Sequence, residues 1–169
     1  MRAGRDERAR VRAAQRGSAS DLEELFRAHW PRAYRAAYLV THDAAAAEDI
    51  AQESFLAAIR ALDRFDRRRP FGPWLHRIAV NRAIDWTRAR KLRAEVELGE
   101  SLPASEPARP PCDDVLAALA RLPPDHRAVI VLRYLLELTP GEIAETLDLP
   151  RGTVNSRLRR GLDSLAEEL

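Results

Sequence analysis

TPGEIAETLDLPRGTVNSRLRRG, residues 139–161, contains two helical patterns separated by a short turn. Thr139 is followed by Pro140 and, three positions after the threonine, by Glu142. This is a capping-box arrangement at the start of a helix, with proline in the first turn. The segment Asp148–Pro150 then breaks the helix. The spacing therefore predicts a helix-turn-helix over this stretch.

The second helix of this motif carries charges of one sign only. Four arginines and no acid occur between residues 151 and 160, while Val154 and Leu158 occupy the side that would be buried. Such a helix fits the major groove of DNA, where arginine and asparagine read base edges and serine contacts phosphate. The side chains left free for this are Arg151, Asn155, Ser156, Arg159 and Arg160. DNA binding is the favoured interpretation, and an ordinary amphipathic helical hairpin is the alternative.

The composition indicates an all-α protein of one or two small domains. The chain has 169 residues, of which 46% are hydrophobic and 32% charged, and its net charge is +2. Alanine, arginine and leucine recur at helical spacing, and runs of β-branched residues are scarce. No apolar run approaches the roughly 18 residues that a membrane span needs. The single cysteine, Cys112, excludes an internal disulfide and fits a reducing cytoplasm.

An acidic, proline-rich segment divides the chain. Residues 94–114 contain four prolines and six acids against one arginine, a local charge of −5. Such a segment cannot bury enough apolar surface to fold, so a flexible linker is expected at 94–112. The linker separates a helical domain at 18–93 from a four-helix domain at 113–169. Residues 1–17, which carry six arginines, are expected to form a flexible basic arm.

The first domain contains a helix with an acidic face. A capping box at Ser20–Glu23 and a cap at Asp43 predict the starts of two helices, the second over about residues 44–63. On this second helix the apolar positions share one side, and Asp49 and Glu53 stand four residues apart on the other. Like charges at this spacing cost a few tenths of a kcal/mol. A basic protein partner and a merely solvated helix face both explain the pair.

A strongly basic stretch follows the acidic face. Residues 64–93 have nine arginines and one lysine against two acids, a net charge of +8. The prolines and glycine of Arg67–Pro73 predict a loop before the next helix. Dense arginine beside aromatic rings suits single-stranded nucleic acid, because cations follow the backbone and rings stack on bases. Trp74 is expected in the core and Trp86 is the more exposed ring. RNA, acidic protein and lipid head groups are alternative ligands of such a patch.

Three phrases of the sequence, in this order, resemble bacterial sigma factors of the extracytoplasmic function group, in the sigma-70 family. They are AEDIAQESFLAAIRALDRFD at 47–66, FGPWLHRIAVNRAIDWTRAR at 71–90 and LPPDHRAVIVLRYLLELTPGEIAETLDLPRGTVNSRLRR at 122–160. The resemblance covers residues 20–169. It implies an alternative sigma factor that binds core RNA polymerase, recognises promoter DNA and opens it to initiate transcription of a specific regulon.

The resemblance also implies roles for individual residues. The helix at 49–66 would dock on a coiled coil of the largest polymerase subunit through Asp49, Gln52, Glu53 and Leu56. The loop and helix at 66–90 would melt the minus-ten element and hold its non-template strand through Arg67, Arg68, Phe71, Asn81, Arg82, Trp86, Arg88 and Arg90. The last helix would contact the minus-thirty-five duplex through Arg151, Thr153, Asn155, Ser156, Arg159 and Arg160.

Further partners and a location follow from the same resemblance. The polymerase flap would be a second contact on core polymerase, and the acidic linker would lie in the RNA-exit path. Because no further domain follows Leu169 in the sequence, regulation is expected from another protein, and anti-sigma factors are the usual regulators in this group. The implied location is cytoplasmic and nucleoid-associated, without membrane insertion, and an anti-sigma factor can hold such a protein at the membrane.

Three positions depart from the family pattern. Asn155 stands where lysine or arginine is common, and Trp86 is bulkier than usual. Gly161 stands where alanine is common, which would weaken the last helix by roughly 1 kcal/mol.

Two other classes of function remain as alternatives. A helix-turn-helix regulator acting without polymerase would explain residues 139–161 but would leave the acidic face and the basic stretch unused. An enzyme acting on nucleic acid has little support, because the four histidines are scattered, the cysteine is alone and no glycine-rich phosphate loop occurs. No catalytic residue, metal ligand or cofactor is expected.

Overall fold

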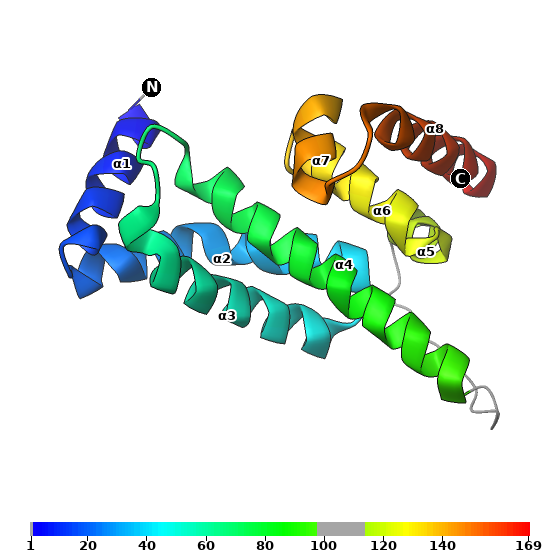
Figure 1. Cartoon of the computed structure of the whole chain (residues 1–169), viewed down its shortest axis with the longest axis horizontal. Coiled ribbons are helices and arrows are strands. Elements are labelled where there is room, and N and C mark those ends of the chain that lie inside the picture. The colour runs from blue at the N-terminus through cyan, green and yellow to red at the C-terminus, as the bar shows by residue number, and fades with distance from the viewer. Residues whose placement is uncertain (1, 98–113) are drawn as a thin grey trace.

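A computed structural model describes residues 2–97 and 114–169, and all regular structure in these two ranges is helical (Figure 1). This confirms the all-α fold. In chain order the helices are α1 Arg2–Gln15, α2 Ala19–Thr41, α3 Ala44–Ala61, η1 Leu62–Arg64, α4 Phe71–Glu97, α5 Asp114–Arg121, α6 Pro124–Ile130, η2 Val131–Leu135, α7 Pro140–Leu147 and α8 Arg151–Glu168. Of these, η1 is a single 3₁₀ turn and η2 is a π-helical continuation of α6.

The flexible arm predicted for residues 1–17 is wrong, because α1 is a helix packed on the first domain. Its residue Val11 is only 2% exposed and lies in one apolar cluster with Leu25 and Phe65. The Gln15 side-chain amide adds a hydrogen bond to the Leu62 carbonyl oxygen at 2.8 Å. The many arginines suggested a solvated segment, whereas one valine and one glutamine on the same helical face anchor it.

Helices α2, α3 and α4 pack against one another and form the body of the first domain (Figure 1). The N-cap of α2 is Ser18, two residues before the serine predicted from the sequence, and its hydroxyl accepts from the Asp21 N–H at 3.3 Å. Pro31 lies inside α2, which continues to Thr41. The predicted cap of α3 is confirmed, since the Asp43 carboxylate accepts from the Ala46 N–H at 3.0 Å.

Helix α4 extends to Glu97, past the predicted start of the linker at residue 94. The helical pattern therefore continues into the acidic segment for one further turn. The rest of the predicted linker, including Cys112, lies outside the described residues.

The helix-turn-helix predicted for residues 139–161 is confirmed as α7 and α8. The Thr139 hydroxyl accepts from the Glu142 N–H, and the Glu142 carboxylate accepts from the Thr139 N–H at 2.8 Å, which completes the capping box. The Thr139 N–H and the Thr139 hydroxyl both donate to the Glu142 carboxylate, and these two hydrogen bonds lower its pKa. Asp148 closes α7 in the left-handed conformation with φ of 51°, which aspartate tolerates better than most residues.

Gly161 has a packing role that the sequence interpretation missed. It is buried where α8 crosses α6, and a Cβ atom there would lie 2.8 Å from the Ile130 Cδ1. The glycine thus allows close approach of the two helices, in addition to its cost in helix propensity.

Helices α1–α4, called here the first unit, and helices α5–α8, called here the second unit, share one apolar core. Val40 and Ile84, from the first unit, belong to the same buried cluster as Val129, Leu132 and Leu158, from the second. Helix α6 contacts both α2 and α4, and α7 contacts α4, so the second unit rests on the long helix α4 (Figure 1).

Candidate polymerase and nucleic-acid interfaces

The stripe of α3 predicted to bind polymerase is exposed. Asp49, Gln52, Glu53 and Leu56 all face solvent, and Leu56 is 47% exposed although it is apolar. On the opposite side of the helix, Phe55 is buried. The periodicity of the sequence therefore placed the exposed stripe correctly, whereas Ile59, expected on the apolar side, is 42% exposed.

The acidic face has a cationic neighbour that no periodicity could reveal. The Arg82 guanidinium, from α4, lies 2.8 Å from the Glu53 carboxylate. Both side chains, with Asp49 and Trp86, line a groove of about 290 Å³ between α3 and α4. Residues expected to bind polymerase and residues expected to bind DNA therefore meet in one groove.

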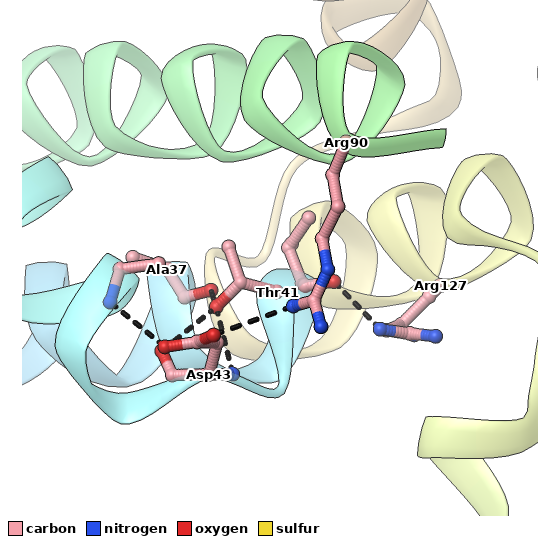
Figure 2. A network of polar contacts seen from close by, with 7 residues as sticks. Ala37, Thr41, Asp43, Arg90 and Arg127 are labelled. Atoms are coloured by element: carbon pink, nitrogen blue, oxygen red, sulfur yellow. Dashed lines mark hydrogen bonds and ion pairs between the residues drawn. The ribbon is translucent and has the colours of Figure 1, made fainter. Parts of the chain in front are cut away.

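The arginines predicted to follow the melted strand along α4 are paired with acids from other helices. Besides Arg82, these are Arg88, which lies 3.6 Å from Asp125 of α6, and Arg90, which lies 3.3 Å from Asp43 at the start of α3 (Figure 2). The Asn81 side-chain amide, also on α4, donates to a backbone carbonyl oxygen of α7 at 3.4 Å. These three arginines of α4 are thus paired within the protein, and Asn81 contacts the second unit.

Two aromatic residues differ from their predicted exposure. Phe71, expected to contact the minus-ten strand, is only 3% exposed and packs against Phe65 and Trp74. Trp86, expected to be the exposed ring, is half-buried against the shared core, with the Arg90 guanidinium 5.1 Å from its ring centre. Spacing alone could not place either ring, because both positions lie at edges of the apolar face of α4.

The turn that precedes α4, residues 66–70, is called here the arginine loop. Arg67, Arg68 and Arg69 are all exposed. The Asp66 carboxylate closes the turn by accepting from the Arg68 N–H at 3.0 Å and pairing with the Arg68 guanidinium at 3.1 Å. These contacts lower the pKa of Asp66. The loop therefore presents its cations on a closed turn.

A buried arginine joins the two units, and no local sequence pattern indicated its role. Arg127 of α6 is 6% exposed and donates to the carbonyl oxygens of Val40, Ala120 and Leu122 at 2.7 to 2.9 Å. The first of these closes the C-terminal end of α2 (Figure 2). Burial lowers the Arg127 pKa to about 10, so the guanidinium stays charged at neutral pH.

Burial at the same junction suppresses ionisation of a histidine. His42 follows α2 with φ of 52°, and burial together with the nearby Arg127 charge lowers its pKa to about 4. The neutral ring can pack beside a buried cation, whereas an imidazolium would repel it.

The minus-thirty-five face predicted on α8 is open to solvent. Arg151, Asn155, Arg159 and Arg160 are exposed, and Thr153 and Ser156 are half-buried. Arg157 is the arginine of this helix that forms an ion pair within the described residues, at 2.8 Å from Asp125.

Within residues 2–97 and 114–169 there is no group of three or more His, Cys, Asp or Glu side chains arranged to hold a metal ion. Among the described helices, none combines the length with the apolar composition that a membrane span requires.

Comparisons with known proteins decide the family. Models of Sigma-70 region 2 and Sigma-70, region 4 match residues 25–93 and 112–165. The chain is 34% identical to the ECF RNA polymerase sigma factor SigW of Bacillus subtilis, over 95% of both proteins. The chain belongs to the extracytoplasmic function (ECF) group of the sigma-70 family. It is also 34% identical to the sigma factor SigL of Mycobacterium tuberculosis, over 93% of both proteins.

Solved structures agree with this sigma-factor assignment. CnrH in complex with the cytosolic domain of CnrY is 29% identical and superposes with a TM-score of 0.68 over 96% of both chains. The sigma factor RpoE of Bartonella quintana, in complex with the anti-sigma factor NepR, has a TM-score of 0.70 over 89% of this chain and 97% of that one. At 21% identity the second likeness supports the fold alone. Helix α1 precedes the region 2 match.

Proposed function

We propose that this sigma factor binds core RNA polymerase through the exposed stripe of α3, formed by Asp49, Gln52, Glu53 and Leu56. The stripe combines two carboxylates, an amide and an exposed leucine on one helical face. A partner helix with basic and apolar side chains complements it, as the coiled coil of the largest polymerase subunit would. The Glu53–Arg82 pair is exposed, and such pairs are worth at most about 1 kcal/mol, so a partner can displace it.

The arginine loop and α4 are proposed to bind the melted non-template strand of the minus-ten element. Support comes from the exposed Arg67 and Arg68 and from the arginines that follow them along α4. Phe71 is removed from the proposed contacts, because its buried ring supports the loop from inside. Asn81 and the three paired arginines of α4 would exchange their intramolecular partners for phosphates. In this proposal residues 18–93 act as sigma domain 2.

Helix α8 is proposed to read the minus-thirty-five duplex, with residues 113–169 acting as sigma domain 4. The observation that carries the proposal is the one-sign exposed face of a capped helix-turn-helix, since Arg151, Arg159 and Arg160 have no acidic partner among the described residues. Contacts with the polymerase flap and an anti-sigma factor belong to the same proposal. The complex of CnrH with the cytosolic domain of CnrY supports a protein partner of this kind.

Transcript starts test the whole proposal. The purified protein is mixed with bacterial core polymerase and genomic DNA fragments, and the 5′ ends of the transcripts are sequenced. Discrete starts that need this protein and share two spaced upstream motifs are expected. An active core that gives no protein-dependent starts, even on DNA from the same organism, would favour a regulator acting without polymerase.

Charge reversal tests the α3 contact. Asp49→Lys should lower core affinity at least tenfold, because it places a cation in the centre of the stripe while the Glu53–Arg82 pair remains. Glu48→Lys is the matched control, since Glu48 is an exposed acid one position outside the stripe. Fluorescence titration of labelled protein with core measures both affinities. Equal effects of the two substitutions would contradict the assignment.

A further inference from the structure

Helix α1 has a face that contacts both ends of the segment carrying the arginine loop. Glu7, Val11 and Gln15 stand four residues apart and therefore share one side of the helix. This set is called here the α1 contact face. None of these residues lies in the part of the chain that matches Sigma-70 region 2.

At the first end of the segment, Gln15 contacts the backbone just before the loop. Its Nε2 donates to the carbonyl oxygens of Leu62 and Phe65, at 2.8 and 3.3 Å. Leu62 begins the 3₁₀ turn, and its carbonyl oxygen also accepts from the Phe65 N–H at 3.0 Å, while Phe65 caps the end of the turn. The direction in which the chain leaves α3 is thereby tied to α1.

At the second end, Glu7 contacts the backbone just after the loop. Its Oε1 accepts from the Gly72 N–H at 3.1 Å and lies 3.3 Å from the His29 Nε2. Gly72 is in the first turn of α4, whose free N–H groups and dipole favour a carboxylate. A Cβ at Gly72 would lie 2.7 Å from the His29 ring, so glycine is needed for this approach.

Between these two ends, Val11 supports the loop from beneath. It is 2% exposed and belongs to the cluster that contains Phe65 and Phe71, the two aromatic residues that flank residues 66–70. The two rings pack edge to face, with centres 5.8 Å apart. The α1 contact face therefore contacts the backbone on both sides of the arginine loop and packs against the two rings that flank it.

We propose that the α1 contact face positions the arginine loop for recognition of the melted strand, with Glu7 and Gln15 as positioning residues. This inference rests on the proposed role of the loop in minus-ten recognition. A base held by a loop is discriminated by the placement of a few hydrogen-bonding groups. Loosening either end of the segment should therefore lower the discrimination between bases more than it lowers binding to core.

The test uses holoenzyme made with the full-length protein, on a promoter found from its own transcript starts. The readout is the ratio of open-complex rates on that promoter and on a copy with one minus-ten base replaced at the position most sensitive in the wild type. Glu7→Ala and Gln15→Leu should each reduce this ratio by about three- to tenfold. Glu7→Gln keeps an oxygen that accepts from the Gly72 N–H and should restore most of the ratio.

Controls separate positioning from damage to the fold. Arg12→Ala changes an exposed residue of the same helix and should leave the ratio unchanged. Core affinity should stay within about twofold for every variant, since α3 is untouched. Gln15→Leu acts at the opposite end of the segment from Glu7, so it tests the proposal even where Glu7→Ala fails to fold. Ratios equal to wild type for folded Glu7→Ala and Gln15→Leu would overturn it.

A loop variant distinguishes failure of this inference from failure of the proposed function. If Arg67→Ala lowers the ratio but the α1 variants do not, α1 does not position the loop. If Arg67→Ala also leaves the ratio unchanged, the loop does not read the strand, and the role of α1 fails with it.

Discussion

The two surfaces proposed to bind DNA differ in whether their arginines form ion pairs within the protein. On α8, Arg159 and Arg160 face solvent without an acidic partner in the described part of the chain. On α4, Arg82, Arg88 and Arg90 each pair with a carboxylate from another helix. The surface proposed to read the duplex is therefore available in the free protein, whereas the α4 part of the surface proposed to bind the melted strand must first give up intramolecular contacts.

This difference matches the order of the two binding events. Duplex DNA is present before initiation, but the melted strand exists only after opening has begun. Exposed ion pairs contribute about 1 kcal/mol or less each, so the strand phosphates can replace them at small cost. The neutralised surface would also bind unrelated nucleic acid less strongly, because non-specific affinity depends on unpaired cations.

The largest effect is expected from Arg127, which joins the two units that carry the compared surfaces. Arg127→Ala removes a guanidinium and leaves the carbonyl groups of Val40, Ala120 and Leu122 without their donor. The free energy of unfolding should fall by about 3 kcal/mol or more. Urea denaturation followed by circular dichroism measures the loss. Arg121→Ala, which removes an exposed arginine paired with Glu168, is the control and should cost less than about 1 kcal/mol.

The next largest effect should come from the available surface itself. Arg159→Ala with Arg160→Ala should weaken binding to minus-thirty-five duplex by about thirtyfold and reduce the dependence of log affinity on log salt by about two. Fluorescence anisotropy between 50 and 200 mM salt measures both quantities. An unchanged salt slope would mean that α8 does not contact the phosphate backbone.

Whether a feature of the fold or of the candidate site could be predicted depends on the distance along the chain between the residues that interact. The helix-turn-helix and its capping box were predicted because Thr139 and Glu142 are three positions apart. The pairs that neutralise α4 join residues from 29 to 47 positions apart, and no local pattern reports them. Periodicity also gave the exposed stripe of α3 correctly, since one helix contains all of it.

Phe71 and helix α1 were placed wrongly for the same reason, because their contacts come from other parts of the chain. Phe71 sits at the first position of α4, where an aromatic ring next to arginines suggested base stacking, but the neighbouring rings of Phe65 and Trp74 come from both sides of a loop and enclose it. Helix α1 was missed because five arginines dominate its composition. The usable signal was the spacing of Glu7, Val11 and Gln15 on one face.

Acid should lower the free energy of unfolding by protonating buried histidines, among them His42 at the junction between the two units. His42 has a pKa of about 4 in the folded protein and about 6.5 when unfolded, so the unfolded chain binds the proton more readily. Stability should be complete above about pH 6.5 and fall as the pH drops from there to about 4, by on the order of 1 kcal/mol for this group. His76, with a pKa also lowered to about 4 by burial, should add to the loss.

A substitution isolates the contribution of His42. His42→Asn keeps a residue that tolerates the left-handed backbone at φ of 52° and removes the titrating group. The difference in unfolding free energy between pH 7 and pH 5, measured in urea, should be smaller for the variant than for the wild type. An equal difference would place the acid sensitivity elsewhere, with His76 as the first candidate.

The smallest expected effect is the most direct test of the comparison. It frees arginines of α4 from their acidic partners, so that this surface resembles the unpaired surface of α8, without moving the backbone. Asp43→Asn removes the carboxylate that pairs with Arg90, and Asp125→Asn removes the one that pairs with Arg88 of α4 and Arg157 of α8. Asparagine can still cap α3. Binding of an oligonucleotide with the non-template minus-ten sequence should tighten about two- to fivefold at low salt, and the gain should shrink as salt rises. Asp63→Asn with Glu48→Gln, which also removes two negative charges from exposed residues, is the control for net charge. If this control tightens binding equally, the effect is long-range attraction and the pairs on α4 do not restrain binding.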